Sequence, residues 1–402
     1  MKKQKMAALI TCILVVGLAG VWHCVVQKSQ VKESIKVGFV YIGDESNPYV
    51  YNFIRAQKSI ENQFGDKVQV VEKFNVPENA VEEPLVELAK EKCDVIFATS
   101  YGYGKTTKEV AKKYPEIQFC QATGDNANQN PIVSNYHTYM GAVYQGRYIA
   151  GIVAGMKLQE MISEGKITPQ DAKIGYVGAY AYAEVISGYT SFYLGVRSVV
   201  PEAVMTVKYT NTWSSYSTEK QAAKELVDED CVVISQHSDT VGPAAICENA
   251  QRDIPVYHVG YNQSMTDIAP TRSLVSCCVD YSSYFEQSVY ALLHDKKIEE
   301  CIDGRTYKQD AMAGIDKGWV RILDINEAIV PKGTKEMVED TIEKIEKGKL
   351  EVFSGPFTGV SVFDRNDKIN LNTPYKENAN SSSPSFSYVL DDVITIEKMK
   401  EE

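Results

Sequence analysis

Short β-branched runs alternate with longer amphipathic segments along most of this chain, and that alternation restricts the fold more than any other feature. The predicted strands cover residues 36–42, 68–73, 94–99, 118–123, 173–178, 203–209, 231–236, 255–260 and 274–279. Helix-length stretches lie between most of them, at 49–64, 81–92, 105–113, 144–156, 183–199, 218–228 and 242–252. This βαβα order predicts parallel sheets covered by helices on both faces. Two sheets are favoured over one sheet of so many strands, so we predict an α/β fold of two doubly wound, Rossmann-like lobes.

Weak internal symmetry supports two lobes, because each half opens with a strand ending in glycine and carries a later strand ending in a Ser- or Thr-containing cluster. The chain is expected to cross between the lobes near residues 136–139, 261–263 and 308–318, which makes a multi-strand hinge. The first lobe is then 34–137 plus 263–310, and the second is 138–262 plus 311–364. Residues 365–402 form a C-terminal extension, in which an Asn- and Ser-rich flexible connector precedes a short apolar segment.

The amino terminus predicts a protein that works outside the cytoplasm. Lys2, Lys3 and Lys5 precede an almost unbroken apolar run over residues 7–26, so residues 1–33 are predicted to be a signal peptide or membrane anchor. The positive residues would stay in the cytoplasm and the rest of the chain would cross. Cys24 could carry a lipid, although residues 21–23 are not the small residues that a signal peptidase needs. An uncleaved anchor and a lipidated or cleaved signal both remain open.

The charge balance and the cysteines restrict the partners. A net charge of −11 and a pI near 5.2 argue against nucleic-acid or anionic-lipid partners, which need clustered Lys and Arg. Seven of the nine cysteines lie beyond residue 33: Cys93, Cys120, Cys231, Cys247, Cys277, Cys278 and Cys301. None has Cys-x-x-Cys spacing, and four adjoin apolar strand-like runs, so small buried hydrophobes are favoured over metal ligands. A disulfide stays open.

Catalytic motifs are not found in the sequence. Gly104-Lys105-Thr106 is similar to the end of a phosphate-binding loop, but Thr99 stands where its first glycine would be. His237 and Asp239 lack a positioned nucleophile, and no His-x-x-x-His pair supplies metal ligands. We therefore predict a protein that is not an enzyme and that uses no cofactor and no metal.

Polar and aromatic side chains follow the predicted strands, and ligands of open parallel sheets bind outside the carboxyl ends of the strands. The set is Asp44, Asn47, Tyr49, Ser100, Tyr101, Tyr103, Thr123, Asp125, Tyr180, Tyr182, Glu184, Asn211, Trp213, His237, Asp239, Tyr261, Asn262 and Asp280. Aromatic rings, carboxylates and amides without Lys or Arg suit a flat, uncharged heteroaromatic ligand rather than an anion. Individual tyrosines could instead pack in the core, and Asp239 or Asp280 could cap a helix.

Five unusual segments carry a family resemblance: Ala-Thr-Ser-Tyr-Gly-Tyr at 98–103, Gln-Gly-Arg-Tyr-Ile-Ala-Gly at 145–151, Ala-Glu-Val-Ile-Ser-Gly at 183–188, Ser-Gln-His-Ser-Asp at 235–239 and Gly-Pro-Phe-Thr-Gly at 355–359. Their order and spacing resemble the basic membrane protein (BMP) family of bacterial solute-binding proteins, which bind purines or purine nucleosides and feed ABC importers. The resemblance implies a type I periplasmic-binding architecture, an extracytoplasmic location and an ABC permease and ATPase as partners.

The resemblance also implies a ligand. Asn47 and Tyr49 stand nearest to the polar and aromatic residues that hold the base in the family. Nucleoside-binding members grip the ribose with a lysine and an aspartate, whereas Asp280 and, approximately, Asn262 stand at those places here. The segments around Trp213 and Asp239 look like the family branch for which free purine base is expected.

The implied function is an extracytoplasmic solute-binding protein that holds adenine, guanine or hypoxanthine between its lobes. The alternative is a membrane-anchored purine or nucleoside sensor that signals to a partner membrane protein. The predicted ligand-binding residues are Asn47, Tyr49, Ser100, Tyr101, Tyr182, Glu184, Trp213, His237, Asp239, Asn262 and Asp280.

Overall fold

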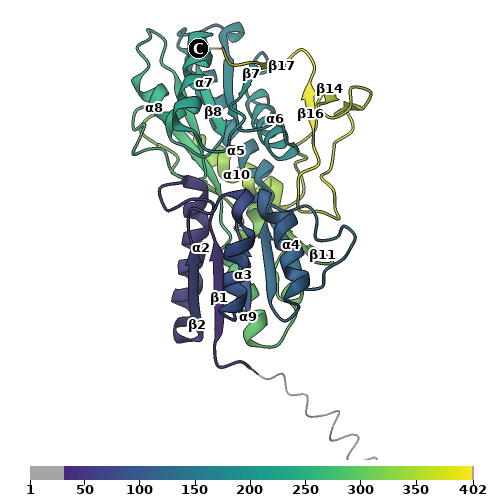
Figure 1. Ribbon diagram of the computed structural model, residues 1–402. Helices are drawn as coiled ribbons and strands as arrows, with labels where there is room; N and C mark the ends of the chain where they lie inside the picture. The colour runs from purple at the N-terminus through teal and green to yellow at the C-terminus, as the bar shows by residue number, and fades with distance from the viewer. Residues whose placement is uncertain (1–30, 401–402) are drawn as a thin grey trace, which may run out of the picture.

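Two seven-stranded sheets form the centres of two lobes, which lie one above the other in Figure 1. The computed structural model describes residues 31–400. The first sheet has the strand order β11-β12-β5-β4-β3-β1-β2, and the second has the order β13-β10-β9-β8-β6-β7-β17. Most neighbouring strands are parallel, with antiparallel pairs only at the β11 and β13 edges of these two sheets. The predicted α/β fold of two doubly wound lobes is confirmed.

The first lobe is the lower one in Figure 1. Its strands are β1 (Ile35–Val40), β2 (Val68–Lys73), β3 (Val95–Ala98), β4 (Gln118–Ala122), β5 (Tyr136–Gly141), β11 (Arg305–Tyr307) and β12 (Asp310–Ala313). Its helices are α2 (Pro48–Phe64), α3 (Glu82–Lys90), α4 (Gly104–Lys113) and α9 (Ser282–Leu293). Alternate residues of β3 point to opposite faces: Phe97 packs in the cluster that includes Phe53 of α2 and Phe285 of α9, whereas Ile96 packs against Leu85 of α3.

The second lobe is built in the same way. Its strands are β6 (Lys173–Gly178), β7 (Val204–Tyr209), β8 (Val233–His237), β9 (Tyr257–Tyr261), β10 (Ser273–Val279), β13 (Val320–Leu323) and β17 (Ile394–Glu397). Its helices are α5 (Val143–Ser163), α6 (Ala183–Arg197), α7 (Tyr216–Asp228), α8 (Gly242–Asn249) and α10 (Thr334–Glu346). Helices α5 and α6 meet at Gly151 and Gly195, where a Cβ atom would lie about 2 Å from a backbone oxygen of the other helix. Gly151, the second glycine of the 145–151 segment, is therefore required for packing.

The lobe boundaries differ from those predicted. Residues 136–141 form β5 of the first sheet, so the chain first crosses after Gly141 rather than near 136–139. Strand β10 pairs with β9 in the second sheet, so the second crossing follows Val279 rather than residues 261–263. The link from β9 to β10 contains no helix, so the sequence does not mark β10 as the next strand of the same sheet. The third crossing lies between β12 and β13, at residues 314–319, which overlap the predicted region 308–318.

The C-terminal extension belongs mainly to the second lobe. Strands β14 (Thr358–Ser361), β15 (Lys368–Asn370) and β16 (Tyr388–Leu390) form a small antiparallel sheet at its side, and β17 then adds a parallel edge strand next to β7. The apolar segment after the Asn- and Ser-rich connector therefore supplies the last strands of the fold. Figure 1 shows this yellow segment running along one side of the molecule.

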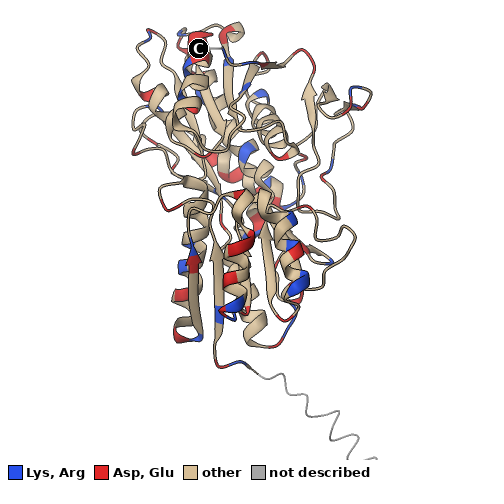
Figure 2. Ribbon diagram, in the orientation of Figure 1, with Lys and Arg blue, Asp and Glu red and all other residues tan. Residues whose placement is uncertain are grey.

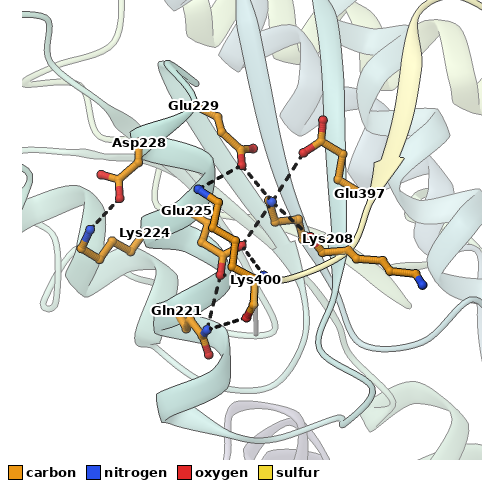
Figure 3. Close-up of polar contacts among 9 residues, drawn as sticks. Lys208, Gln221, Lys224, Glu225, Asp228, Glu229, Glu397 and Lys400 are labelled. Atoms are coloured by element: carbon orange, nitrogen blue, oxygen red, sulfur yellow. Dashed lines mark hydrogen bonds and ion pairs between the residues drawn. The ribbon is translucent and has the colours of Figure 1, made fainter. Parts of the chain in front are cut away.

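A buried lysine fixes β17 to the second lobe (Figure 3). The Lys208 side chain is only 1% exposed, and its Nζ lies 3.2 Å from Glu225, 3.0 Å from Glu229 and 3.5 Å from Glu397 of β17. The backbone N–H of Lys400 also donates to the Glu225 carboxylate at 3.2 Å. A charge taken out of water needs such partners, so Lys208 joins the C-terminal strand to α7.

Replacing Lys208 should therefore destabilise the fold. Lys208→Met keeps the apolar stem but leaves Glu225 unpaired in a buried position, and we expect a loss of about 1 to 2 kcal/mol in the free energy of unfolding. This expected loss is smaller than the loss on breaking a fully buried ion pair, because Glu229 and Glu397 are partly exposed. Lys224→Met is the matched control, since Lys224 pairs with Asp228 in solvent. Urea unfolding that gave equal midpoints for both variants would contradict this role.

Acidic and basic residues are interspersed along the outer helices of both lobes (Figure 2), as expected of solvated surfaces. The seven cysteines of the described chain are free thiols, and all except Cys301 are buried.

None of the helices within residues 31–400 is both long and apolar enough to cross a membrane. The predicted signal or anchor, with Cys24, falls on residues 1–30, outside the described residues.

Candidate ligand-binding site

A cavity of about 220 Å³ lies between the two lobes. The first lobe lines it with Ile42, Gly43, Asn47, Tyr49, Ser100, Tyr101 and Thr123. The second lobe lines it with Glu184, Trp213, Ser214, His237, Asp239 and Tyr261. These residues lie at or just beyond the carboxyl ends of parallel strands, or at the start of the helices that follow, as open α/β sheets place their ligands.

The wall from the first lobe begins at the amino end of α2. The Asn47 Oδ1 atom caps this helix by accepting from the backbone N–H groups of Tyr49 at 2.9 Å and Val50 at 3.1 Å. Its Nδ2 atom lies 3.5 Å from the Ser214 hydroxyl of the other lobe. Asn47 thus has its oxygen engaged in the helix cap, while its amide nitrogen faces the cleft. The Tyr49 ring packs edge-on against Phe53 at 4.9 Å.

Aromatic rings gather on the second lobe at one side of the cavity. Tyr180 and Tyr182 stack at 5.1 Å, and the Trp213 ring lies 5.4 Å from Tyr180 and 6.2 Å from Tyr182. Tyr101 of the first lobe approaches Tyr182 at 5.9 Å. Trp213 and Tyr101 line the cavity, whereas Tyr182, 43% exposed, is not among its lining residues. Apart from the stacked Tyr180–Tyr182 pair, the rings are inclined to one another, and together they form an aromatic group that continues from the cavity to an exposed rim.

Asp239 is an acidic residue of the cavity wall whose pKa is strongly shifted. It is buried, and no ion pair of the described residues includes it. Burial raises the pKa of Asp239 well above its usual range, and the carboxylates of Glu219 and Glu184 raise it further. Its Oδ1 accepts from the Asn262 side chain at 3.1 Å, and its backbone N–H donates to the Trp213 carbonyl at 2.9 Å. The carboxylate therefore has capacity left for hydrogen bonds from a ligand.

Asn262 stands behind Asp239 rather than in the cavity wall. It adopts a left-handed backbone conformation with φ 67°, which asparagine tolerates better than most residues. Its Nδ2 donates to Asp239, and its Oδ1 accepts from Asn52 of α2 at 3.4 Å. The residue thus orients the carboxylate and joins it to the first lobe.

His237 and Glu184 form a second polar group in the wall. The His237 Nε2 lies 3.5 Å from Glu184 Oε1, and the buried imidazole ring lies 4.5 Å from the ring of Tyr261. Burial lowers the pKa of His237 and Arg147 lowers it further, and together they outweigh the opposing effect of Glu184. A Cβ on Gly188 would lie 2.5 Å from His237 Nδ1, which explains the glycine of the 183–188 segment.

Asp280 does not reach the cavity, contrary to the sequence prediction. Its carboxylate lies 3.3 Å from Arg55, accepts from Arg321 at 2.9 Å, and caps α9 by accepting from the Ser282 N–H at 3.1 Å. The pKa of Asp280 is lowered because these hydrogen bonds and the two guanidinium groups outweigh its burial. Asp280 is thus placed as a capping and ion-pairing residue at the second crossing.

This placement predicts a stability effect without a binding effect. The pKa of Asp280 is lower in the folded than in the unfolded protein. The ionised carboxylate therefore stabilises the fold at a pH above the unfolded pKa, and this stabilisation is lost as the pH falls through the folded pKa. Asp280→Asn should cost about 1 to 2 kcal/mol at neutral pH and nothing at strongly acid pH, while changing ligand affinity less than about twofold. Unfolding curves of the wild type and Asp280→Asn at several pH values, with ligand affinity measured in parallel, test this prediction. A large loss of affinity with unchanged stability would return Asp280 to the ligand site.

Of the predicted site residues, the cavity thus brings together Asn47, Tyr49, Ser100, Tyr101, Glu184, Trp213, His237 and Asp239. It leaves out Tyr182, Asn262 and Asp280. Ile42, Gly43 and Ser214 also line it, although neither their type nor their pattern singled them out. Each lies within five residues of a predicted site residue, and that proximity is the signal that could have found them.

The fold and the cavity define a two-lobed solute-binding protein. Residues 37–352 match the family model described as ABC transporter substrate-binding protein, PnrA-like. The chain belongs to this Bmp family, so the resemblance inferred from five short segments is confirmed. Proteins of the family bind substrates for ABC transporters outside the cytoplasm and are not enzymes.

Two relatives support the assignment, and one solved structure supports the fold. A purine-binding protein of Brucella abortus is 31% identical over 327 residues, which cover 81% of this chain and 85% of that protein. A Haloferax volcanii protein, named as a candidate ABC transporter glucose-binding protein, is 29% identical over 326 residues, covering 80% and 75%. A solute-binding protein of an ABC transporter system from Aeropyrum pernix K1 has a TM-score of 0.62 at 15% identity, covering 78% and 92%, and shows the fold alone.

Proposed function

We propose that this protein binds a free purine base, namely adenine, guanine or hypoxanthine, between its lobes and delivers it to an ABC permease and ATPase. The observation that carries the proposal is Asp239, a buried carboxylate that has no cationic partner within residues 31–400 and faces a cavity beside Trp213. Such an acceptor suits the N–H groups on the edge of a purine, and the indole suits its flat face. We further propose attachment to the membrane through lipid on Cys24 or an uncleaved anchor.

Two features favour a base over a nucleoside. The cavity of about 220 Å³ lies below the roughly 300–1,000 Å³ typical of drug-sized ligands. The position where nucleoside-binding relatives are expected to grip ribose holds Asp280, which is engaged with Arg55 and Arg321. The relative named as purine-binding supports a purine ligand without distinguishing base from nucleoside, whereas the relative named for glucose supports a sugar as the competing ligand.

Calorimetry on protein stripped of endogenous ligand tests the proposal. We expect micromolar or tighter binding of adenine, guanine or hypoxanthine, and weaker binding of inosine and guanosine. Glucose is expected to produce no binding heat, because a sugar has no aromatic edge to match the carboxylate and the indole together. Tighter binding of a nucleoside or of glucose than of every free base would refute the base-specific function.

A further inference from the structure

Glu219, a residue that does not line the cavity, connects the two ligand-contacting loops of the second lobe. It lies in the first turn of α7 and is fully buried. One carboxylate oxygen accepts from the backbone N–H of Ser215 at 3.2 Å. The other accepts from the Ser238 hydroxyl at 2.8 Å and from the Thr240 N–H at 3.2 Å. A single side chain thus holds residues on both sides of Asp239 and the residues that follow Trp213.

We propose that Glu219 is a positioning residue that fixes the Trp213 loop and the Asp239 loop, residues 213–215 and 238–240, in the arrangement that receives the ligand. The backbone hydrogen bond from Asp239 N–H to the Trp213 carbonyl joins the same two loops at 2.9 Å. If Glu219 only capped α7, the hydrogen bond from Ser215 would be enough. The hydrogen bonds from Ser238 and Thr240 show that Glu219 also holds the loop that contains Asp239. This inference rests on the proposed function, because it concerns how that site is held.

The charge of Glu219 has a second consequence for the site. The groups around Asp239 are Glu219 from α7, Glu184 from α6, Tyr49 from α2, His237 from β8 and Tyr261 from β9. The negative charge of Glu219 adds to burial in raising the pKa of Asp239. Removing that charge should therefore lower the pKa of Asp239 and move the pH dependence of ligand binding to lower pH.

Glu219→Gln tests the proposal with little change in volume. Its amide nitrogen must face either the Ser215 N–H or the two donors at Ser238 and Thr240, so one loop loses its acceptor. We expect the affinity for the purine base that binds the wild type most tightly to fall roughly tenfold. In the pH range where the base is uncharged, the midpoint of the affinity profile should move to lower pH. In a Trp213→Ala background, Glu219→Gln should reduce the affinity by a smaller factor than in the wild type, because both substitutions act on the Trp213 loop.

Glu225→Gln is the matched control, since Glu225 is a buried glutamate of the same helix that contacts Lys208 and Lys400 instead of the site loops. It should lower stability but leave affinity and its pH midpoint unchanged. Wild-type affinity and an unmoved midpoint in Glu219→Gln would overturn the positioning role while leaving purine binding intact. If the wild type bound no purine base, the proposed function itself would fail. If Glu219→Gln does not fold, Ser238→Ala, which removes one of its hydrogen bonds, should still weaken binding severalfold.

A separate observation concerns residues 377–387 of the C-terminal extension, which contact both lobes. On the first lobe, the Ser382 hydroxyl donates to Asp310 of β12 at 2.7 Å, the Ser382 N–H donates to the same carboxylate, and Arg305 of β11 donates to the Ser381 carbonyl at 2.9 Å. Both Asp310 and Ser382 are buried. On the second lobe, Glu377 accepts from Ser187 of α6 at 3.2 Å.

Aromatic packing also holds this segment against the second lobe. The Phe386 ring is fully buried and stacks on Phe353 at 4.3 Å. The segment lies beyond residue 352, where the match to the family ends. We infer that residues 377–387 are a strap that joins the lobes in addition to the three chain crossings and limits how far they open.

The strap can be tested through ligand release and the shape of the ligand-free protein. Asp310→Ala removes the acceptor for Ser382, so we expect a wider ligand-free form by small-angle scattering and a severalfold faster dissociation of bound base. Arg305→Ala should act in the same direction if Asp310→Ala does not fold. Asp391→Ala is the control, because the Asp391 carboxylate accepts from the Thr358 hydroxyl of β14, at the side of the second lobe. Scattering and dissociation rates equal to the wild type in both strap variants would overturn the inference.

Discussion

Asp239→Ala should reduce the affinity for a purine base roughly a hundredfold or more. The carboxylate can accept two N–H groups from the ligand edge, and hydrogen bonds to a charged group contribute about 1.5 to 3 kcal/mol each. A loss of about 3 kcal/mol corresponds to that change in Kd. The fold should remain, because Asp239 has no ion-pair partner in the described structure and only the Asn262 side chain loses a bond. Calorimetry with adenine, guanine and hypoxanthine measures the effect.

Asp239→Asn separates charge from shape. It keeps the size of the side chain and one acceptor oxygen, but it places an NH₂ group where a ligand N–H or the Asn262 amide needs an acceptor. We expect an affinity between those of the wild type and Asp239→Ala. Wild-type binding by both variants would show that the ligand edge is recognised elsewhere in the cavity.

Trp213→Ala should weaken binding roughly five- to hundredfold. Stacking of a base on an aromatic side chain contributes about 1 to 3 kcal/mol in nucleic-acid complexes, and about 1.4 kcal/mol corresponds to a tenfold change. Trp213→Phe retains a flat ring and should lose less. Tyr182→Ala is a useful comparison, because Tyr182 belongs to the same aromatic group but lies on the exposed rim. A Trp213→Ala protein with an intact fold and unchanged affinity would make the indole a packing residue only.

The sequence was informative where one local pattern determines one structural outcome. The run 95–98 is buried on both faces of a parallel sheet, and the sequence shows it as a continuous apolar strand. Most of the cavity residues could then be located from the sequence, because parallel strands place their carboxyl ends at one edge of the sheet. Asn47, Trp213 and Asp239 all follow from that rule.

The remaining features depend on partners that are distant in sequence. Nothing near Asp280 indicates that Arg55 and Arg321 will occupy its carboxylate. Glu219 looks like an ordinary first-turn glutamate until Ser238 and Thr240 approach it from another strand end. Strand β10 could be assigned to the wrong lobe because its apolar pattern fits either sheet, and only pairing with β9 decides. Long-range pairing of this kind leaves no local signal.

A crystal structure of the protein saturated with adenine, guanine or hypoxanthine would test the central claim most directly. The base is predicted to occupy the cavity between the lobes, with its face against Trp213 and its N–H edge within hydrogen-bond distance of the Asp239 carboxylate. A base bound outside this cavity, or one inside it that contacts neither Trp213 nor Asp239, would contradict the claim.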